Sequence, residues 1–197
     1  MPHPPTPGQV PAHYQEVVYW KLGENKKQYI LINLISIPLG LGVGIFCFWL
    51  LWWLGGDLSG SVDLRRMLWL VGAVVLTLLL HELIHGWVMK RFGATPQYGF
   101  KAKLLALYAT APGYAFTRNQ YVQILLAPLV IITLLAVVGM VLAGGTAVGF
   151  TLALCASFNA TGACGDVYMT YFVCRYPAKA YIIDEADGLR LFLPSSI

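Results

Sequence analysis

The segment of greatest chemical interest is His81-Glu82-Leu83-Ile84-His85. In a helix, residues four apart lie on one face, so His81 and His85 can offer two imidazole nitrogens to one zinc ion while Glu82 stands beside the metal. Zinc brings a bound water to a pKa of about 7. A neighbouring carboxylate can take the proton of that water during attack on a carbonyl and pass it to the leaving amine. The spacing therefore predicts a zinc metallopeptidase site with Glu82 as general base on a zinc-bound water.

The surroundings of this segment argue against a chance match to the pattern. Residues 67–89 contain no ionisable side chain other than His81, Glu82 and His85, and they are otherwise largely apolar. A charge inside a membrane span is costly unless it has a partner. A bound cation would interact favourably with all three polar groups and so offset the cost of placing them in a membrane span. We therefore expect zinc binding rather than an accident of helix packing.

A catalytic zinc site also needs a third protein ligand, with one position left open for water. The remaining histidines lie in a polar N-terminal stretch, and Asp166 is the only carboxylate inside another apolar segment. At about 1.5 Å per residue, Asp166 lies about 14 Å from the cytoplasmic end of its segment, and the two histidines lie about 8 to 14 Å from the end of theirs. These matching depths favour Asp166 as the third ligand.

Other roles for Asp166 and other sources of the third ligand stay open. The carboxylate could end a helix or pair with a nearby basic residue, namely Lys90, Arg91 or Arg175. A carboxylate of the C-terminal stretch could be the ligand instead: Asp184, Glu185 or Asp187. Asn159 precedes Asp166 by two helical turns on the same face, so we expect it to hold substrate or to hydrogen-bond a metal ligand. A plain hydrogen bond between helices is the alternative for Asn159.

The elements that must position these residues are apolar runs. The chain has 197 residues, of which 58% are hydrophobic and 11% charged, and its mean hydropathy is +0.67, which lies outside the balance of a soluble domain. Four runs are long enough to cross about 30 Å of hydrocarbon, at about residues 29–54, 67–89, 121–142 and 146–173. We therefore predict an all-α polytopic membrane protein with about four transmembrane helices.

The stretches outside these runs complete the predicted organisation. Residues 97–117 interleave Tyr, Phe and Thr with lysines around Pro112-Gly113, which favours a short β-hairpin at the cytoplasmic membrane surface. Residues 1–28 are expected to form a cytosolic polar tail, residues 29–175 the membrane metalloprotease domain, and residues 176–197 a cytosolic C-terminal tail. The proline-rich N-terminal stretch lacks the features of a signal peptide.

The distribution of basic residues predicts the orientation. Eleven of the 13 Lys and Arg residues face the cytoplasm if both termini are cytoplasmic, which leaves only Arg65 and Arg66 outside. We therefore expect a multi-pass protein of the cell membrane with both termini inside. The formal charge of +4 is spread between the runs, so nucleic acid is not an expected partner. The four cysteines lack the paired spacing of a zinc or disulfide framework.

The motifs together resemble a known family. Over about residues 78–192, the sequence looks like the bacterial "Putative zincin peptidase" family in the following segments: His81–Gly86, Phe92-Gly93-Ala94, Pro96, Gly165-Asp166 and Asp187-Gly188. The wider pattern is similar to the site-2 proteases, which pair a transmembrane HExxH helix with a second helix bearing an aspartate ligand. This similarity implies intramembrane proteolysis near the cytoplasmic face, with zinc on His81, His85 and Asp166. Site-2 proteases also use an edge strand to clamp extended substrate, and the predicted hairpin lies where such a strand would be. We favour the alternative that its aromatic and basic residues anchor it to lipid headgroups.

The leading functional hypothesis is hydrolysis of peptide bonds in membrane-associated substrates, with the lipid bilayer and a membrane protein or peptide as partners. Two rivals from other classes remain. One is a non-catalytic zinc-binding membrane scaffold or chaperone, and the other is a cation transporter that uses the same ionisable residues. The sequence carries no signal for an oligomeric state.

Overall fold

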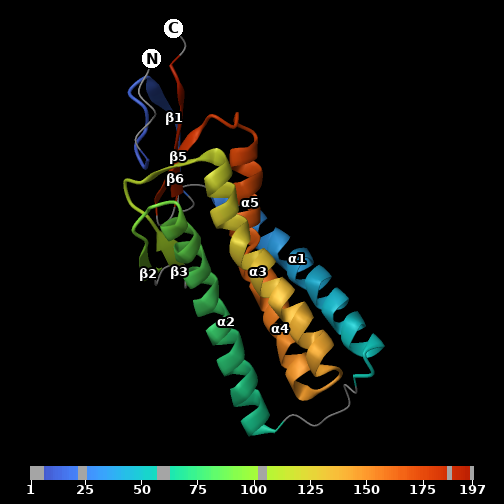
Figure 1. The fold of residues 1–197 in the computed structure, drawn as a ribbon. Coiled ribbons are helices and arrows are strands. Elements are labelled where there is room, and N and C mark those ends of the chain that lie inside the picture. Colours follow the sequence, from blue (N-terminus) through green and yellow to red (C-terminus); the bar gives the residue numbers. More distant parts are fainter. Residues whose placement is uncertain (1–6, 22–25, 57–62, 102–105, 186–187, 196–197) are drawn as a thin grey trace. The chain divides into compact units, whose positions relative to one another are not determined.

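A computed structural model describes residues 7–21, 26–56, 63–101, 106–185 and 188–195 of the chain. Its contacts divide the chain into two units. The first unit comprises Met1–Leu31, Glu82–Ala127 and Asp166–Ile197, and the second comprises Ile32–His81 and Pro128–Gly165. Figure 1 shows the helices and strands, which are described below unit by unit.

The first unit contains a four-stranded antiparallel sheet built from distant parts of the chain. Its strands are β1 (Tyr14–Lys21), β4 (Ala115–Thr117), β5 (Tyr181–Glu185) and β6 (Gly188–Pro194), in the order β1-β6-β5-β4. The two ends of the chain therefore pair with each other, and Tyr14 lies opposite Pro194. The paired strands β1 and β6 lie side by side in Figure 1.

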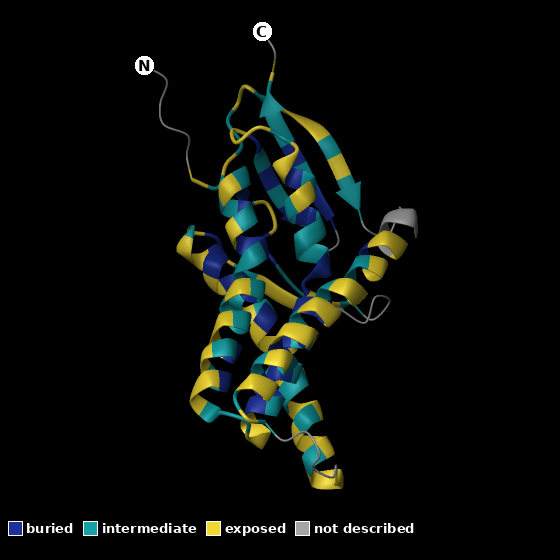
Figure 2. Ribbon diagram, turned by 90° about the vertical axis from the view of Figure 1, so that its right-hand side faces the viewer, coloured by how far each residue is buried: buried dark blue, intermediate teal, exposed yellow. Residues whose placement is uncertain are grey.

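One face of this sheet is packed and the other is open, as is common for antiparallel sheets. Along β5, intermediate and buried residues alternate, and Ile182 is fully buried. Its packing partners include Phe116, Ile124 and Val173 in the core of this unit. Helix α5 (Cys164–Cys174) adds Phe172, whose ring lies 6.2 Å from that of Trp20 on β1. Dark blue residues in Figure 2 mark this buried face of the strands.

Two further strands form a separate hairpin-like pair. Strand β2 (Gln97–Lys101) pairs antiparallel with β3 (Ala106–Thr110). Both strands lie within the stretch predicted as a hairpin, and the pairing confirms that part of the prediction. Strand β4, at the end of the same stretch, pairs with β5 instead.

The helices of the second unit pack through small side chains. They are α1 (Lys26–Trp53), α2 (Leu64–Arg91), α3 (Arg118–Ala143) and α4 (Ala147–Gly162), and α1, α2 and α3 each have one end in the first unit. Three of these helices each contribute two residues to a buried apolar cluster: Cys47 and Leu51 of α1, Ala136 and Met140 of α3, and Ala153 and Ala156 of α4. Small residues at such contacts let helix backbones approach closely.

Helix length and composition fit a bilayer. Within the described part of the chain, three helices are long and apolar enough to cross a membrane, over Ile30–Trp53, Leu64–Arg91 and Arg118–Ala143. The pair α4 and α5 passes the same test together, although a bend of 44° separates the two helices. Only 11 to 28% of the three apolar windows is buried, and Figure 2 shows the exposed residues in yellow along these helices. Contact with lipid would account for such a large exposed apolar surface.

The prediction of an all-α fold is wrong, because the described residues form a mixed α/β structure with two antiparallel sheets. Strands β1, β5 and β6 come from the stretches predicted as polar tails. The physical reason for missing β1 is that its partner β6 lies at the other end of the chain, with Tyr14 opposite Pro194. Strands β5 and β6 pair as neighbours in the sequence, and the prediction of a C-terminal tail overlooks that local pairing. Strand formation depends on such cross-strand packing more than on local composition.

Candidate metal site

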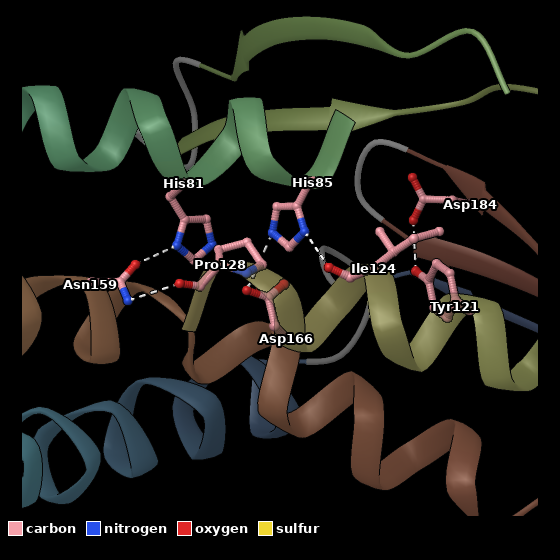
Figure 3. Close-up of polar contacts among 8 residues, drawn as sticks. All are labelled: His81, His85, Tyr121, Ile124, Pro128, Asn159, Asp166 and Asp184. Atoms are coloured by element: carbon pink, nitrogen blue, oxygen red, sulfur yellow. Dashed lines mark hydrogen bonds and ion pairs between the residues drawn. The ribbon is translucent and has the colours of Figure 1, made fainter. Parts of the chain in front are cut away.

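Helix α2 presents the two histidines of the motif one turn apart. The helix begins where the Asp63 carboxylate accepts the backbone N–H of Arg66 at 2.7 Å, an N-cap arrangement. It ends near Gly93, which has a φ of 91°, a conformation that glycine adopts without steric cost. Both His81 and His85 are buried, each with 6% of its surface exposed. Figure 3 shows both rings projecting from the same side of α2.

The inner nitrogen of His85 donates to a backbone carbonyl that a proline has left available. His85 Nδ1 lies 2.8 Å from the carbonyl oxygen of Ile124 on α3. Residue 128, which in a regular helix would donate to that carbonyl, is a proline within α3 and has no N–H. The sequence contained this signal, since a proline inside a helix always frees the carbonyl four residues earlier. The predictions had assigned Pro128 no role at the site.

The inner nitrogen of His81 faces the side chain of Asn159 on α4. His81 Nδ1 lies 2.9 Å from Asn159 Oδ1, and Asn159 Nδ2 donates to the carbonyl of Pro128 at 3.3 Å. The orientation of the amide follows from these contacts, because a carbonyl can only accept and so must face the NH₂ group. Asn159 is fully buried. Figure 3 shows this chain of contacts from His81 through Asn159 to Pro128.

These two contacts define the protonation of the neutral imidazoles. Each Nδ1 faces an oxygen acceptor, so each Nδ1 carries the hydrogen and each Nε2 keeps its lone pair. A metal-binding histidine in proteins typically donates its other ring N–H to an oxygen in this way, which sets the tautomer and the ring orientation. His81 and His85 are therefore prepared to offer Nε2 to a cation.

Asp166 completes a group of three ligand atoms. It lies in the first turn of α5, and its Oδ2 is 3.5 Å from His85 Nε2. One ligand atom from each of His81, His85 and Asp166 lies within 4.8 Å of the others. In a tetrahedral zinc site with bonds of about 2.1 Å, neighbouring ligand atoms are about 3.4 Å apart. The 3.5 Å separation and the set of two imidazoles and one carboxylate both fit zinc.

The break between α4 and α5 explains how Asp166 comes to lie at a helix N-terminus. The Ala163 N–H bonds back to the carbonyl of Asn159 and ends α4, and α5 begins at Cys164. A carboxylate in the first turn interacts favourably with the free N–H groups and the dipole of the helix. The predicted uninterrupted segment 146–173 had placed Asn159 and Asp166 on one straight helical face. The bend of 44° replaces that face with two helix ends.

The C-terminal carboxylates behave differently from Asp166. Asp184 is buried and accepts the hydroxyl of Tyr121 at 2.6 Å, and burial raises its pKa to about 6 against the opposing effect of this hydrogen bond. Glu185 accepts the hydroxyl of Tyr19 at 3.0 Å. Asp187 lies outside the described residues. Neither Asp184 nor Glu185 belongs to the three-residue group found among the described residues.

The strand that follows α2 packs onto the motif. Gly86 comes directly after His85, and a side chain at this position would collide with the ring of Tyr98 on β2. The glycine therefore allows β2 to approach the helix turn that carries the second histidine. Glu82, on the same turn, is half-buried. The roles expected for the predicted site residues remain predictions; these residues are His81, Glu82, His85, Asn159 and Asp166. The structure adds Ile124, Pro128 and Tyr98 as neighbours of the site.

Comparison with known proteins adds one family. A sequence model of the family described as "Putative zincin peptidase" matches residues 74–181, which is more than half of the chain. The matched range contains the histidine motif, Asn159 and Asp166. No curated protein and no solved structure matches the chain.

Proposed function

Because the chain belongs to the family described as "Putative zincin peptidase", we propose that it is a membrane-embedded zinc metallopeptidase. We propose further that it hydrolyses peptide bonds of membrane-associated proteins or peptides near the cytoplasmic face. Its long apolar helices support the membrane part of the proposal. The family supports the peptidase part.

One observation carries the proposal most directly. The ligand atoms of His81, His85 and Asp166 lie within 4.8 Å of one another, and each histidine has its Nδ1 engaged by an oxygen acceptor. A histidine held only for packing has no need of a carboxylate 3.5 Å from its outer nitrogen. This combination is typical of a metal site.

The residues would act as follows. His81, His85 and Asp166 hold the zinc, which when bound supplies the Lewis acidity that activates water and polarises a carbonyl. Glu82 accepts a proton from the attacking water and delivers it to the leaving amine. Asn159 and the Ile124 carbonyl keep the two imidazoles in the tautomer that binds metal. The arrangement of an HExxH helix with an aspartate from another helix is similar to that of the site-2 proteases.

The catalytic role of Glu82 can be tested without knowing the substrate. Cells lacking the native gene would express the wild type, Glu82→Gln, or the matched surface variant Glu185→Gln, and new protein N-termini would be catalogued by mass spectrometry. We expect a set of membrane-protein fragments that the wild type and Glu185→Gln generate and Glu82→Gln does not. Identical catalogues for the wild type and Glu82→Gln, with zinc bound to both, would instead favour a non-catalytic zinc-binding scaffold.

The ligand set has a separate test. Elemental analysis of purified protein should find about one zinc per wild-type chain and a strong loss in His81→Ala, His85→Ala and Asp166→Ala. His13→Ala serves as the matched control, because His13 lies outside the motif. Full zinc content in Asp166→Ala would exclude Asp166 as the third ligand. Zinc flux into proteoliposomes that depends on His85 would point to a transporter.

A further inference from the structure

The second unit contains an apolar cavity away from the predicted metal ligands. Its volume is about 510 Å³, and three helices line it. The α2 side of the cavity consists of residues one turn apart: Leu68, Trp69, Gly72, Ala73, Leu76, Thr77 and Leu80. The opposite wall comes from α3 and α4, including Ala136, Leu152 and Cys155. The far end of the cavity is at Leu80, directly before His81 in the sequence.

A second cavity of about 450 Å³ adjoins the first and shares Trp69 with it. Its other lining residues are Asp63, Arg65, Arg66 and Ala147. The Asp63 carboxylate accepts the Arg66 backbone N–H, so one of its oxygens already serves as the helix cap. Two of the described lining residues are arginines and one is an aspartate, so these side chains together carry a net positive charge. The guanidinium of Arg66 also lies over the ring of Phe150, 5.5 Å from its centroid.

The length of the apolar cavity suits a hydrocarbon chain. From Trp69 to Leu80 the cavity follows α2 for about 16 Å at about 1.5 Å per residue. The length agrees with one leaflet, since the hydrocarbon core of a bilayer is about 30 Å thick and one leaflet about 15 Å.

The order of chemistry along α2 matches the order of groups in a phospholipid. Arg65 and Arg66 come first, Trp69 follows, and apolar residues continue to Leu80. Trp69 is held at the junction by a hydrogen bond from its Nε1 to Thr151 Oγ1 at 3.3 Å, and tryptophan is enriched where hydrocarbon meets headgroups. Basic pockets between membrane helices bind anionic headgroups. We propose that the two cavities form one site for an anionic phospholipid, with its phosphate at Arg65 and Arg66 and one acyl chain along α2.

This proposal is independent of the peptidase chemistry, because a lipid bound here contacts neither Glu82 nor the predicted zinc ligands. Its physical effect is on α2. A lipid that fills the space between α2, α3 and α4 stabilises the native packing of the helix that carries His81.

Native mass spectrometry of the purified full chain in mild detergent tests the site, with phosphatidylglycerol and phosphatidylcholine as probes. The charge is tested by Arg65→Gln/Arg66→Gln, with Lys90→Gln/Arg91→Gln at the other end of α2 as the matched control. Compared with the wild type, we expect Arg65→Gln/Arg66→Gln to retain phosphatidylglycerol at least about tenfold less well, and to retain phosphatidylcholine almost unchanged. Equal losses in the two double variants would overturn the proposal.

The cavity is tested by a substitution that fills it. Gly72 lines the cavity and has no neighbour within 4 Å of an added Cβ, so the side chain of Gly72→Leu has room to start and is expected to extend into the acyl position. Gly42 on α1 has the same freedom and does not line the cavity, which makes Gly42→Leu the matched control. We expect Gly72→Leu, but not Gly42→Leu, to lower the retention of both phosphatidylglycerol and phosphatidylcholine. Unchanged lipid retention in Gly72→Leu would refute the lipid site. The site would also be refuted if a single-span oligoleucine peptide bound the wild type and Arg65→Gln/Arg66→Gln but not Gly72→Leu.

Discussion

At the scale of single residues, the side chains that do not touch a metal decide how the two histidines present themselves. His81 Nδ1 faces the Asn159 amide oxygen, and His85 Nδ1 faces the Ile124 carbonyl. An imidazole that lacks such an acceptor can turn or change tautomer and so lose its orientation toward the metal. Asn159 is therefore a positioning residue in our interpretation rather than a ligand.

Asn159→Ala should weaken zinc binding without removing any ligand. The loss leaves His81 Nδ1–H and the Pro128 carbonyl without a side-chain partner, and removal of such outer partners typically lowers metal affinity by about 10- to 100-fold. Competition with a fluorescent zinc chelator measures the affinity. Asn159→Asp, which keeps an oxygen acceptor for His81, should retain most of it. Equal affinity in the wild type and Asn159→Ala would show that the contact does not orient His81.

At the scale of elements, an irregularity in one helix serves the motif on another. Pro128 interrupts the hydrogen-bond ladder of α3, and the carbonyl thereby released accepts from His85 on α2. A helix without the proline would direct the Ile124 carbonyl to its own ladder.

Pro128→Ala should therefore change thermal stability and zinc affinity in different directions. Restoring the backbone N–H strengthens α3, since a proline in a helix interior costs about 3 kcal/mol, but it also gives His85 a competitor for the Ile124 carbonyl. We expect an unchanged or higher melting temperature together with weaker zinc binding. Pro38→Ala in α1 is the matched control, because that proline lies inside another helix. A parallel decrease of stability and zinc affinity would indicate a packing defect instead.

Strand β5 brings a buried acid into contact with α3. Asp184 accepts the Tyr121 hydroxyl at 2.6 Å, and its Oδ2 is buried without a hydrogen-bond partner among the described residues. Burial is the main cause of its raised pKa of about 6, compared with 3.8 ordinarily. The folded protein therefore binds this proton more tightly than the unfolded chain does.

The raised pKa predicts the sign of a pH effect. Between about pH 4 and pH 6 the folded state holds the Asp184 proton that the unfolded state has released, so this residue's contribution to stability falls as the pH rises and then levels off above pH 6. The total is on the order of 3 kcal/mol. Thermal unfolding between pH 4 and pH 7.5 should show that Asp184→Asn removes this part of the pH dependence. The same pH profile in both proteins would contradict the assignment.

At the scale of the whole molecule, the four-stranded sheet constrains how the chain crosses a membrane. Strand β1 precedes α1, β4 lies between α2 and α3, and β5 follows α5, yet all three belong to one sheet. A sheet with open edges does not lie in hydrocarbon, so these strands share one side. The chain must therefore cross an even number of times between β1 and β4, and again between β4 and β5. We infer that the bent pair α4 and α5 supplies the fourth crossing.

This inference predicts that both termini lie on the same side, and the distribution of basic residues predicts that this side is the cytoplasm. Green fluorescent protein fused to either end should fluoresce, and alkaline phosphatase fused to either end should be inactive. Alkaline phosphatase activity from only one terminus would be incompatible with the β1–β6 pairing. Activity from both would keep the pairing and reverse the orientation.

Much of the molecule was predictable from local sequence. A pair of histidines four residues apart lies on one helix face whatever the rest of the chain does, and apolar runs of membrane length form helices for reasons internal to each run. For the same reason the hairpin strands β2 and β3 could be predicted from residues 97–117, because their partners are neighbours in the sequence.

Tertiary structure decided what depends on partners far along the chain. The sheet joins Tyr14 to Pro194, so the N-terminal stretch resembles a tail in the sequence because the partner of β1 lies at the other end of the chain. The C-terminal strands β5 and β6 do pair as sequence neighbours, and the prediction of a tail there overlooks this local pairing. Likewise, only folding could bring Asp166 to within 3.5 Å of His85 while Asp184 is bonded to Tyr121. Carboxylates look alike in a sequence. Which of them meets the imidazoles is decided by the bend between α4 and α5 and by the packing of β5, both of which are properties of the whole fold.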